Sequence, residues 1–164
     1  MTIRDATEAD LSAIVEIYNA AIPGRQATAD TEPVSVESRG DWFREHHLER
    51  RPLWVAVDDG AILGWLSFQS FYGRPAYRAT AEVSVYVSPS KQRAGIGRAL
   101  LARAIEQAPR LGLKTLLGFI FGHNNPSLHL FESFGFKRWA TLPGVAELDG
   151  VERDLVIVGR RLVG

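Results

Sequence analysis

The chain has 164 residues, of which 46% are hydrophobic and 23% are charged, so we expect it to fold as one soluble globular domain spanning residues 1–164. Its 19 basic residues balance its 19 acidic residues, which argues against recruitment of nucleic acid or a membrane by overall charge. The sequence shows no signal segment and no apolar run of about 18 residues, so we expect a cytoplasmic protein. The chain contains no cysteine, which excludes disulfides, thiolate–zinc sites and a covalent thioester on the protein.

The first part of the chain is predicted to contain a short strand and two helices. Residues 2–6 are a candidate strand, and Thr7-Glu8-Ala9-Asp10 resembles the capping box at the start of a helix. The apolar positions that mark this helix are Leu11, Ile14, Val15, Tyr18 and Ala21. Residues 25–34 are polar and have no period, which indicates a loop. A second helix, capped by Ser35 or Ser38, is expected to run through His46 and His47 and to end before Pro52.

Three candidate strands follow. Residues 53–57 and 61–71 are joined by Asp58-Asp59-Gly60, which is a hairpin signal. Residues 71–78 are rich in aromatic residues and arginine and are predicted to form a loop. In the strand 80–87, valines alternate with Glu82, Ser84 and Tyr86, which is the period of a half-buried strand.

Residues 92–98 connect this last strand to an amphipathic helix. About four backbone N–H groups at the start of a helix lack helical partners, and the helix dipole is positive there, so phosphate is a natural ligand. Gly95 and Gly97 remove Cβ atoms that would keep a ligand away from the backbone, and Arg93 and Arg98 add positive charge. We therefore expect a loop that binds polyphosphate; the alternative is a tight turn in which the glycines only relieve strain.

The C-terminal part is predicted to contain three strands and one helix. Residues 114–121 are almost continuously apolar, as in a strand covered on both faces. Asn125 is expected to be the N-cap of a helix that ends at Gly135, and residues 136–142 and 151–162 are the last two strands. The order of elements predicts an α/β fold with a single mixed sheet and helices on both faces.

Several motifs together resemble the GCN5-related N-acetyltransferase (GNAT) family. They are Gln92-x-x-Gly95-x-Gly97 between a strand and a helix, Asn124-x-x-Ser127, and Gly135-Phe136. The segments that are similar to the phosphinothricin and methionine sulfoximine acetyltransferase branch are Arg74-Pro75-Ala76-Tyr77, Glu82-x-Ser84-Val85-Tyr86-Val87 and Asn124-x-Pro126-Ser127. The resemblance covers nearly the whole chain and implies the GNAT fold, in which a mostly antiparallel sheet is splayed between its fourth and fifth strands.

The resemblance also implies acetyl-CoA as the co-substrate, while the spacing of the histidines leads us to expect no metal. The residues that it assigns to acetyl-CoA are Val85, Tyr86, Val87, Arg93, Ala94, Gly95, Ile96, Gly97, Arg98, Asn124 and Ser133. Without it, Asn124 would be interpreted as an Asx turn beside the cap at Asn125. None of the four histidines has a usual zinc-ligand spacing to another histidine or a carboxylate.

Glu82 is the leading candidate for the base that removes a proton from the acceptor amine, since an α-amine has a pKa near 8 and is mostly protonated at neutral pH. The alternative is a salt bridge from Glu82 to Arg78 or Arg74. Acceptor recognition is expected from the loop that precedes this strand, through Phe71, Arg74, Pro75, Ala76 and Tyr77. Arg74 would bind a carboxylate as a fork; a solvated arginine and ordinary core aromatics are the competing interpretation.

The expected reaction is direct transfer of an acetyl group to the α-amine of a small amino-acid analogue of the methionine sulfoximine, methionine sulfone or phosphinothricin type. Phe131 departs from the family pattern, because many members carry at this position a tyrosine that protonates the leaving thiolate, and the branch often carries histidine. The alternatives are another acceptor amine (a polyamine, an aminoglycoside or a protein N-terminus) and an acyl-CoA-binding sensor without catalysis. A homodimer is usual in the branch and is expected here.

Overall fold

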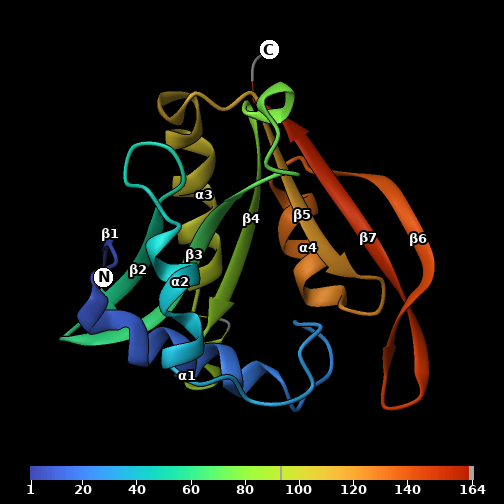
Figure 1. Ribbon diagram of the computed structural model, residues 1–164, viewed down its shortest axis with the longest axis horizontal. Coiled ribbons are helices and arrows are strands. Elements are labelled where there is room, and N and C mark those ends of the chain that lie inside the picture. Colours follow the sequence, from blue (N-terminus) through green and yellow to red (C-terminus); the bar gives the residue numbers. More distant parts are fainter. Residues whose placement is uncertain (93, 163–164) are drawn as a thin grey trace.

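The structure is a computed structural model that describes residues 1–92 and 94–162. Seven strands form one sheet in the order β1-β2-β3-β4-β5-β7-β6 (Figure 1). The strands are β1 (Thr2–Asp5), β2 (Leu53–Asp58), β3 (Ala61–Ser70), β4 (Thr80–Val87), β5 (Thr115–Phe121), β6 (Lys137–Leu148) and β7 (Val151–Arg161). Every neighbouring pair is antiparallel except β4 and β5, which are parallel. The predicted mixed, mostly antiparallel sheet is therefore confirmed.

The parallel pair is joined only at one end. Residues 80–82 of β4 pair with residues 115–117 of β5, and no pairing between these two strands continues beyond Glu82. On its other side β4 remains paired with β3 as far as Val87. The two strands consequently separate like the arms of a V (Figure 1), which confirms the expected splay between the fourth and fifth strands.

Helices cover both faces of the sheet (Figure 1). The helices α1 (Leu11–Ala21) and α2 (Gly40–Arg44) lie on one face, and α3 (Ile96–Gln107) and α4 (Asn125–Ser133) lie on the other. Short 3-10 turns are found at Glu8–Asp10, Glu37–Arg39, Pro75–Tyr77, Pro89–Lys91 and Ala108–Leu111. No helix in the described ranges combines the length and the hydropathy that crossing a membrane requires.

Side-chain alternation along β4 divides the core into two layers. Val83 lies in the larger apolar cluster with the buried residues of α3, whereas Tyr86 packs against the smaller cluster beneath α1 with Trp65. The predicted alternation is therefore correct. The hairpin between β2 and β3 is also as predicted, because Asp59 and Gly60 both have positive φ, as a two-residue type I′ turn requires.

Three predicted boundaries are wrong. The second helix ends at Arg44 instead of continuing through His46 and His47, and the His46 imidazole folds back so that Nδ1 lies 2.9 Å from the Trp42 carbonyl oxygen. The strand predicted for residues 136–142 continues to Leu148, because a shift in register between residues 142 and 146 carries the chain past Pro143 and Gly144. The third is the start of α4, which lies one residue earlier than predicted.

Candidate functional site

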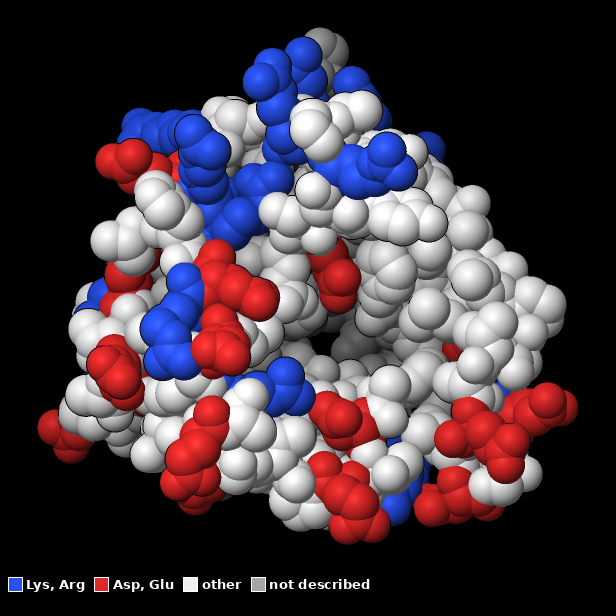
Figure 2. Space-filling model, viewed as in Figure 1, with Lys and Arg blue, Asp and Glu red and all other residues white. Residues whose placement is uncertain are grey.

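The separation of β4 and β5 opens a cleft with a cavity volume of about 420 Å³. It is lined by residues 26–29, 82–86 and 119–121 and by Asn124, Ser127, Phe131, Val145, Ala146 and Leu155. Figure 2 shows a hollow near the centre of this face, with an acidic group in its upper wall and basic side chains gathered above it. The cleft thus brings together the segment after α1, both strands of the V, the start of α4 and the hairpin of β6 and β7.

The backbone of β4 is exposed to this cleft. Beyond Glu82, β4 has no pairing partner on the β5 side, although its other edge is fully paired with β3. The side chains of Val85 and Val87 point instead into the apolar layer beneath α3. Backbone N–H and C=O groups alternate between the two edges of a strand, so those of Val85 and Val87 face the open side and are available to a ligand that lies in the V. Those of Tyr86 face β3, its paired neighbour, which corrects the prediction for this residue's backbone.

The start of α3 lies at the open end of the V, where the predicted phosphate loop connects the two elements (Figure 1). Gly95 is the N-cap with a φ of 81°, a left-handed conformation in which a Cβ atom would be strained. Ala94 N donates to Lys91 O at 3.3 Å, but no described residue accepts a hydrogen bond from the amides of residues 95–98. These amides, at the positive end of a 12-residue helix, form an anion-binding arrangement. The prediction for Arg93 lies outside the described residues.

Gly97 serves a packing purpose as well. A Cβ atom there would lie 3.4 Å from Leu130 Cδ2 and 3.7 Å from Val87 Cγ2, so the small residue lets the first turn of α3 approach α4 and β4 closely. Ile96 is buried in the same layer. The first turn of α3 is therefore fixed in place by its packing.

Arg98 and Ser133 are brought together at the outer rim of this region. Arg98 Nη1 donates to Ser133 Oγ at 3.0 Å, and the Ser133 hydroxyl donates to Leu130 O at 2.6 Å. The Arg98 guanidinium also lies 4.8 Å from the centre of the Phe134 ring. Both residues are exposed, so this pair borders the predicted phosphate site without entering the cleft.

Glu82 lies at the apex of the V, at the last paired position of β4. Burial raises the pKa of its carboxyl group above the usual value, and a long hydrogen bond of 3.5 Å from Ser84 Oγ opposes this effect. The ion pairs of the described residues do not include one between Glu82 and Arg74 or Arg78, so the salt bridge considered as the alternative is not formed. A half-buried carboxylate without a cation partner is suited to accept a proton.

Asn124, and not Asn125, is the N-cap of α4, which corrects the prediction from the sequence. Its Oδ1 accepts from Ser127 N at 3.3 Å, whereas Asn125 is already the first helical residue. Its Nδ2 donates to Gln26 O at 3.1 Å. Asn124 lines the cleft, but both of its side-chain groups already have protein partners.

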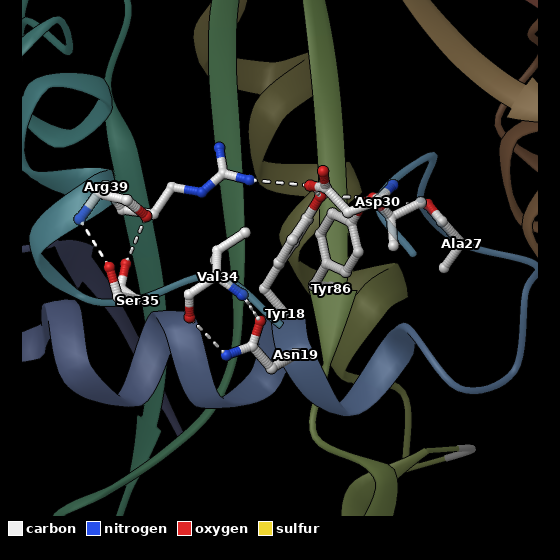
Figure 3. Close-up of polar contacts among 10 residues, drawn as sticks. Tyr18, Asn19, Ala27, Asp30, Val34, Ser35, Arg39 and Tyr86 are labelled. Atoms are coloured by element: carbon white, nitrogen blue, oxygen red, sulfur yellow. Dashed lines mark hydrogen bonds and ion pairs between the residues drawn. The ribbon is translucent and has the colours of Figure 1, made fainter. Parts of the chain in front are cut away.

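Residues 25–30, which we call the strap, bridge the two arms of the V. Three consecutive carbonyl oxygens of the strap accept hydrogen bonds: Arg25 O from His123 Nε2 at 2.8 Å, Gln26 O from Asn124 Nδ2 at 3.1 Å and Ala27 O from Tyr86 Oη at 2.9 Å. Asp30 of the strap accepts from Arg39 Nη2 at 3.0 Å and from Tyr18 Oη (Figure 3). The sequence indicated only a loop here. Any residue type can accept a hydrogen bond through its backbone carbonyl oxygen, so these contacts cannot be predicted from the residue types of the strap.

The loop between β3 and β4 is placed differently from the rest of the predicted site. Arg74, Pro75, Ala76 and Tyr77 are exposed and line a separate surface depression. A neighbouring depression adds Arg50, Arg51 and Arg78. Of the predicted acceptor-binding residues, Phe71 comes nearest to the cleft, with its ring centre 6.4 Å from that of Phe119 in the cleft wall. The structure therefore does not bring residues 74–77 into the cleft of this chain.

A second cavity of about 180 Å³, which we call the aromatic chamber, adjoins the cleft beneath α1 and α2. Its walls are Ile14, Val15, Tyr18, Val34, Arg39, Trp42, Trp65, Ser67, Gln69, Ser84 and Tyr86. Ser84 and Tyr86 line both cavities. The sequence analysis missed this chamber, although the alternation along β3 and β4 already put Trp65, Ser67 and Gln69 at positions of one parity. Within the described part of the chain, no group of three or more histidine or acidic side chains is arranged to hold a metal ion.

Comparisons with known proteins agree with this geometry. The sequence model of the Acetyltransferase (GNAT) family matches residues 12–136. YwnH of Bacillus subtilis (strain 168) is 53% identical over 163 residues, which cover 99% of each chain. The L-methionine sulfoximine/L-methionine sulfone acetyltransferase of Salmonella typhimurium (strain LT2) is 36% identical over 162 residues, covering 99% of this chain and 95% of that protein.

A solved structure adds the ligand. The GNAT superfamily phosphinothricin acetyltransferase of Sinorhizobium meliloti, in complex with acetyl-CoA, has a TM-score of 0.92 and 31% identity, covering 98% of this chain and 87% of that chain. The two chains therefore share the same overall fold.

Proposed function

We propose that this chain, which belongs to the Acetyltransferase (GNAT) family, transfers the acetyl group of acetyl-CoA to the α-amine of a small amino-acid analogue of the methionine sulfoximine, methionine sulfone or phosphinothricin type. One observation carries the proposal: a cleft between two separating parallel strands opens onto a helix start whose amides have no acceptor in the described chain. The relatives act on acceptors of this type according to their names. The type of acceptor is therefore inferred from similarity to the relatives, and the binding of acetyl-CoA is inferred from the geometry of the cleft.

Acetyl-CoA supplies an activated acetyl thioester. The amides of residues 95–98, with Ala94 and Arg98 beside them, would hold its diphosphate. The free backbone groups of Val85 and Val87 would hold the pantetheine arm and polarise the acetyl carbonyl. Asn124 and Ser133 remain candidates for contacts with the pantetheine and the outer part of the cofactor.

Glu82 would act as the base. The acceptor nitrogen attacks the carbonyl carbon, the carbon–sulfur bond breaks, and Glu82 takes the proton that the amine loses. This assignment is supported by the position of Glu82 at the apex of the V and by its raised pKa. A carboxyl group whose pKa is shifted toward neutrality retains its proton better than an ordinary surface carboxylate.

The thiolate must obtain a proton without help from residue 131. The Phe131 ring lines the cleft, is buried, and packs edge-on against Phe136 at 5.0 Å between ring centres. A phenyl ring cannot donate, so the proton would come from water, from the product ammonium or from another side chain. The same feature motivates the second candidate function, an acyl-CoA-binding sensor without turnover.

The acceptor carboxylate is proposed to reach the arginines above the cleft. Arg74 remains the candidate fork, and Arg50, Arg51 and Arg78 line the same basic depression. Arg74 would bind the carboxylate from the rim, where Pro75, Ala76 and Tyr77 lie beside it. Phe71 would contact the acceptor from the edge of the cleft. A homodimer and a location in the cytoplasm are further predictions for this chain.

A thiol-release assay with acetyl-CoA and a panel of amines tests the proposal. The panel contains methionine sulfone, methionine sulfoximine, phosphinothricin, a polyamine, an aminoglycoside and a peptide with a free N-terminus. We expect turnover with the first three and little with the others. Turnover confined to another amine would contradict the assigned acceptor, and binding of acetyl-CoA without any turnover would favour the sensor.

A further inference from the structure

We propose that the aromatic chamber binds the side chain of the acceptor, and that Gln69 and Arg39 donate hydrogen bonds to the oxygen atoms of a neutral head group such as a sulfone or sulfoximine. This inference rests on the proposed function, since it assigns a location to one part of that acceptor. It concerns residues that lie outside the predicted acceptor loop.

The chamber lies within reach of an amine held at Glu82. Gln69 is the direct cross-strand partner of Glu82, so their side chains share a face of the sheet with Cβ atoms about 4.5–5.5 Å apart. Gln69 lines the chamber, and Ser84 lines both the chamber and the cleft. An amino acid whose amine contacts Glu82 can therefore extend its side chain across Ser84 into the chamber.

The walls of the chamber are preorganised for an apolar stem. Trp65 stacks on Tyr86 with ring centres 4.7 Å apart, and Trp42 meets Trp65 edge-on at 5.5 Å. Tyr86 is further fixed by the hydrogen bond from its hydroxyl to Ala27 O (Figure 3). Rings that are held by one another need little reordering when methylene groups pack against them, which limits the entropic cost of binding.

The donors in the chamber differ in their availability. Ser67 is occupied, because its hydroxyl lies 2.7 Å from Nε2 of His46, whose Nδ1 carries its proton toward the Trp42 carbonyl. Gln69, by contrast, has no hydrogen-bond partner for its side-chain amide among the described residues. Arg39 uses Nη2 on Asp30, and its Nε and Nη1 have no protein acceptor in the same part of the chain. Two sets of N–H groups therefore remain for oxygen atoms of a ligand.

The charge balance selects a neutral head group. Asp30 lies 3.0 Å from Arg39 and neutralises it, and Tyr18 Oη also bonds to Asp30 and holds it in place (Figure 3). An anionic head group would enter a chamber without a net positive charge and would lose hydration there without full compensation. Sulfone and sulfoximine oxygens are strong acceptors that carry no net charge. We therefore expect both to be preferred over the phosphinate of phosphinothricin.

The test is Gln69→Leu, which keeps the size of the side chain and removes its donors. Loss of a hydrogen bond to a ligand oxygen typically costs about tenfold in kcat/KM. We expect Gln69→Leu to lower kcat/KM for methionine sulfone by about tenfold and to change kcat/KM for methionine, which lacks the oxygens, by less than about twofold. The KM for acetyl-CoA should stay unchanged. Gln107→Leu, the same change on α3 outside both cavities, should leave all values unchanged.

A second variant, Trp42→Phe, tests the inference independently in case Gln69→Leu does not fold. Trp42→Phe enlarges the chamber and should shift selectivity from methionine sulfone toward ethionine sulfone, which has one more carbon. An equal loss for methionine and methionine sulfone in Gln69→Leu, or unchanged selectivity in Trp42→Phe, would overturn this inference and leave the proposed function intact. Failure of the wild-type protein to acetylate any amino-acid analogue would overturn the proposed function itself.

Discussion

Glu82 gains its chemical character from its place in the sheet. It is the last residue of β4 that pairs with β5, so it lies where the two strands begin to separate. Its carboxyl group is therefore half-buried yet faces the cleft. The charged form loses hydration there, which raises the pKa. The same carboxyl group on the outer part of a strand would be an ordinary solvated acid.

Replacing Glu82 by Gln should lower kcat/KM by about 10²–10⁴-fold, the usual contribution of a general base. The raised pKa fixes the direction of the pH effect: a base must be deprotonated, so wild-type activity is lost as the pH falls through that pKa. In Glu82→Gln this limb should vanish, and the remaining activity should rise with pH until the amine itself loses its proton, near pH 8. Thiol release measured across the pH range, with acetyl-CoA affinity as the control, checks this. A wild-type pH profile in the variant would remove Glu82 from the mechanism.

Phe131 is held where a proton donor would be useful. A Cβ atom at Gly118 would lie 2.8 Å from Phe131 Cε2, so the glycine leaves the room that the ring occupies. The ring is therefore packed against Gly118 and faces the cleft. A phenylalanine at this place cannot donate a proton, whereas a tyrosine could.

Phe131→Tyr should raise kcat by several-fold if protonation of the thiolate limits turnover, since a positioned acid accelerates such steps. The KM for the acceptor should not change. Phe134→Tyr, at the C-cap of the same helix but against Arg98, serves as the matched control. Single-turnover measurements would show whether the chemical step has changed; an unchanged kcat in Phe131→Tyr would mean that water or the ammonium supplies the proton without delay.

At the scale of elements, the strap and the start of α4 depend on one side chain. Asn124 caps α4 through Oδ1 and ties the strap through Nδ2. The strap is further anchored by Arg25 Nε, which lies 2.9 Å from Asp149 Oδ2 in the turn between β6 and β7. The strap is thus tied by polar contacts to α1, to β4, to the start of α4 and to the turn between β6 and β7.

Asn124→Ala should destabilise the protein by about 0.5–2 kcal/mol through loss of the cap. For a domain of this size that corresponds to a melting temperature lower by about 2–4 °C for each kcal/mol. Hydrogen exchange in residues 25–29 should also accelerate, because one tie of the strap is lost. Asn125→Ala, the neighbouring change at an exposed helical position, is the control. A larger destabilisation by Asn125→Ala would contradict the assignment of Asn124 as the cap.

At the scale of the whole molecule, the sequence was sufficient for everything that leaves a periodic or positional signal. Alternation identified β4 with its two faces, Asp59-Gly60 identified the hairpin, and Gly135, with a φ of 85°, was correctly expected to end α4. The splay of the sheet came from resemblance alone, because unpaired backbone has no sequence pattern. The adjacent asparagines show a further limit: either residue can cap a helix, and only the register of the chain decides which one does.

The rest of the site depends on contacts between segments far apart in the sequence. The strap is fixed by side chains about 60 to 100 positions further along the chain, and the chamber needs residues from α1, α2, β3 and β4. The basic loop of residues 74–77 was expected at the cleft but lies in a depression of its own. Net charge is zero over the whole chain, yet basic side chains gather above the hollow and acidic ones below it (Figure 2).

The binding of acetyl-CoA to Gly95→Asp, measured by calorimetry, tests the central claim that the amides of residues 95–98 hold the diphosphate. Gly60→Asp is the matched control, because Gly60 and Gly95 have φ values of 78° and 81° and both have open space where a Cβ atom would lie. The left-handed backbone strains an aspartate at both positions, so the control accounts for this cost. We expect Gly95→Asp to weaken binding by at least about 100-fold, through repulsion of the phosphates, and Gly60→Asp to bind like the wild type. Equal affinity of Gly95→Asp and the wild type would contradict the account.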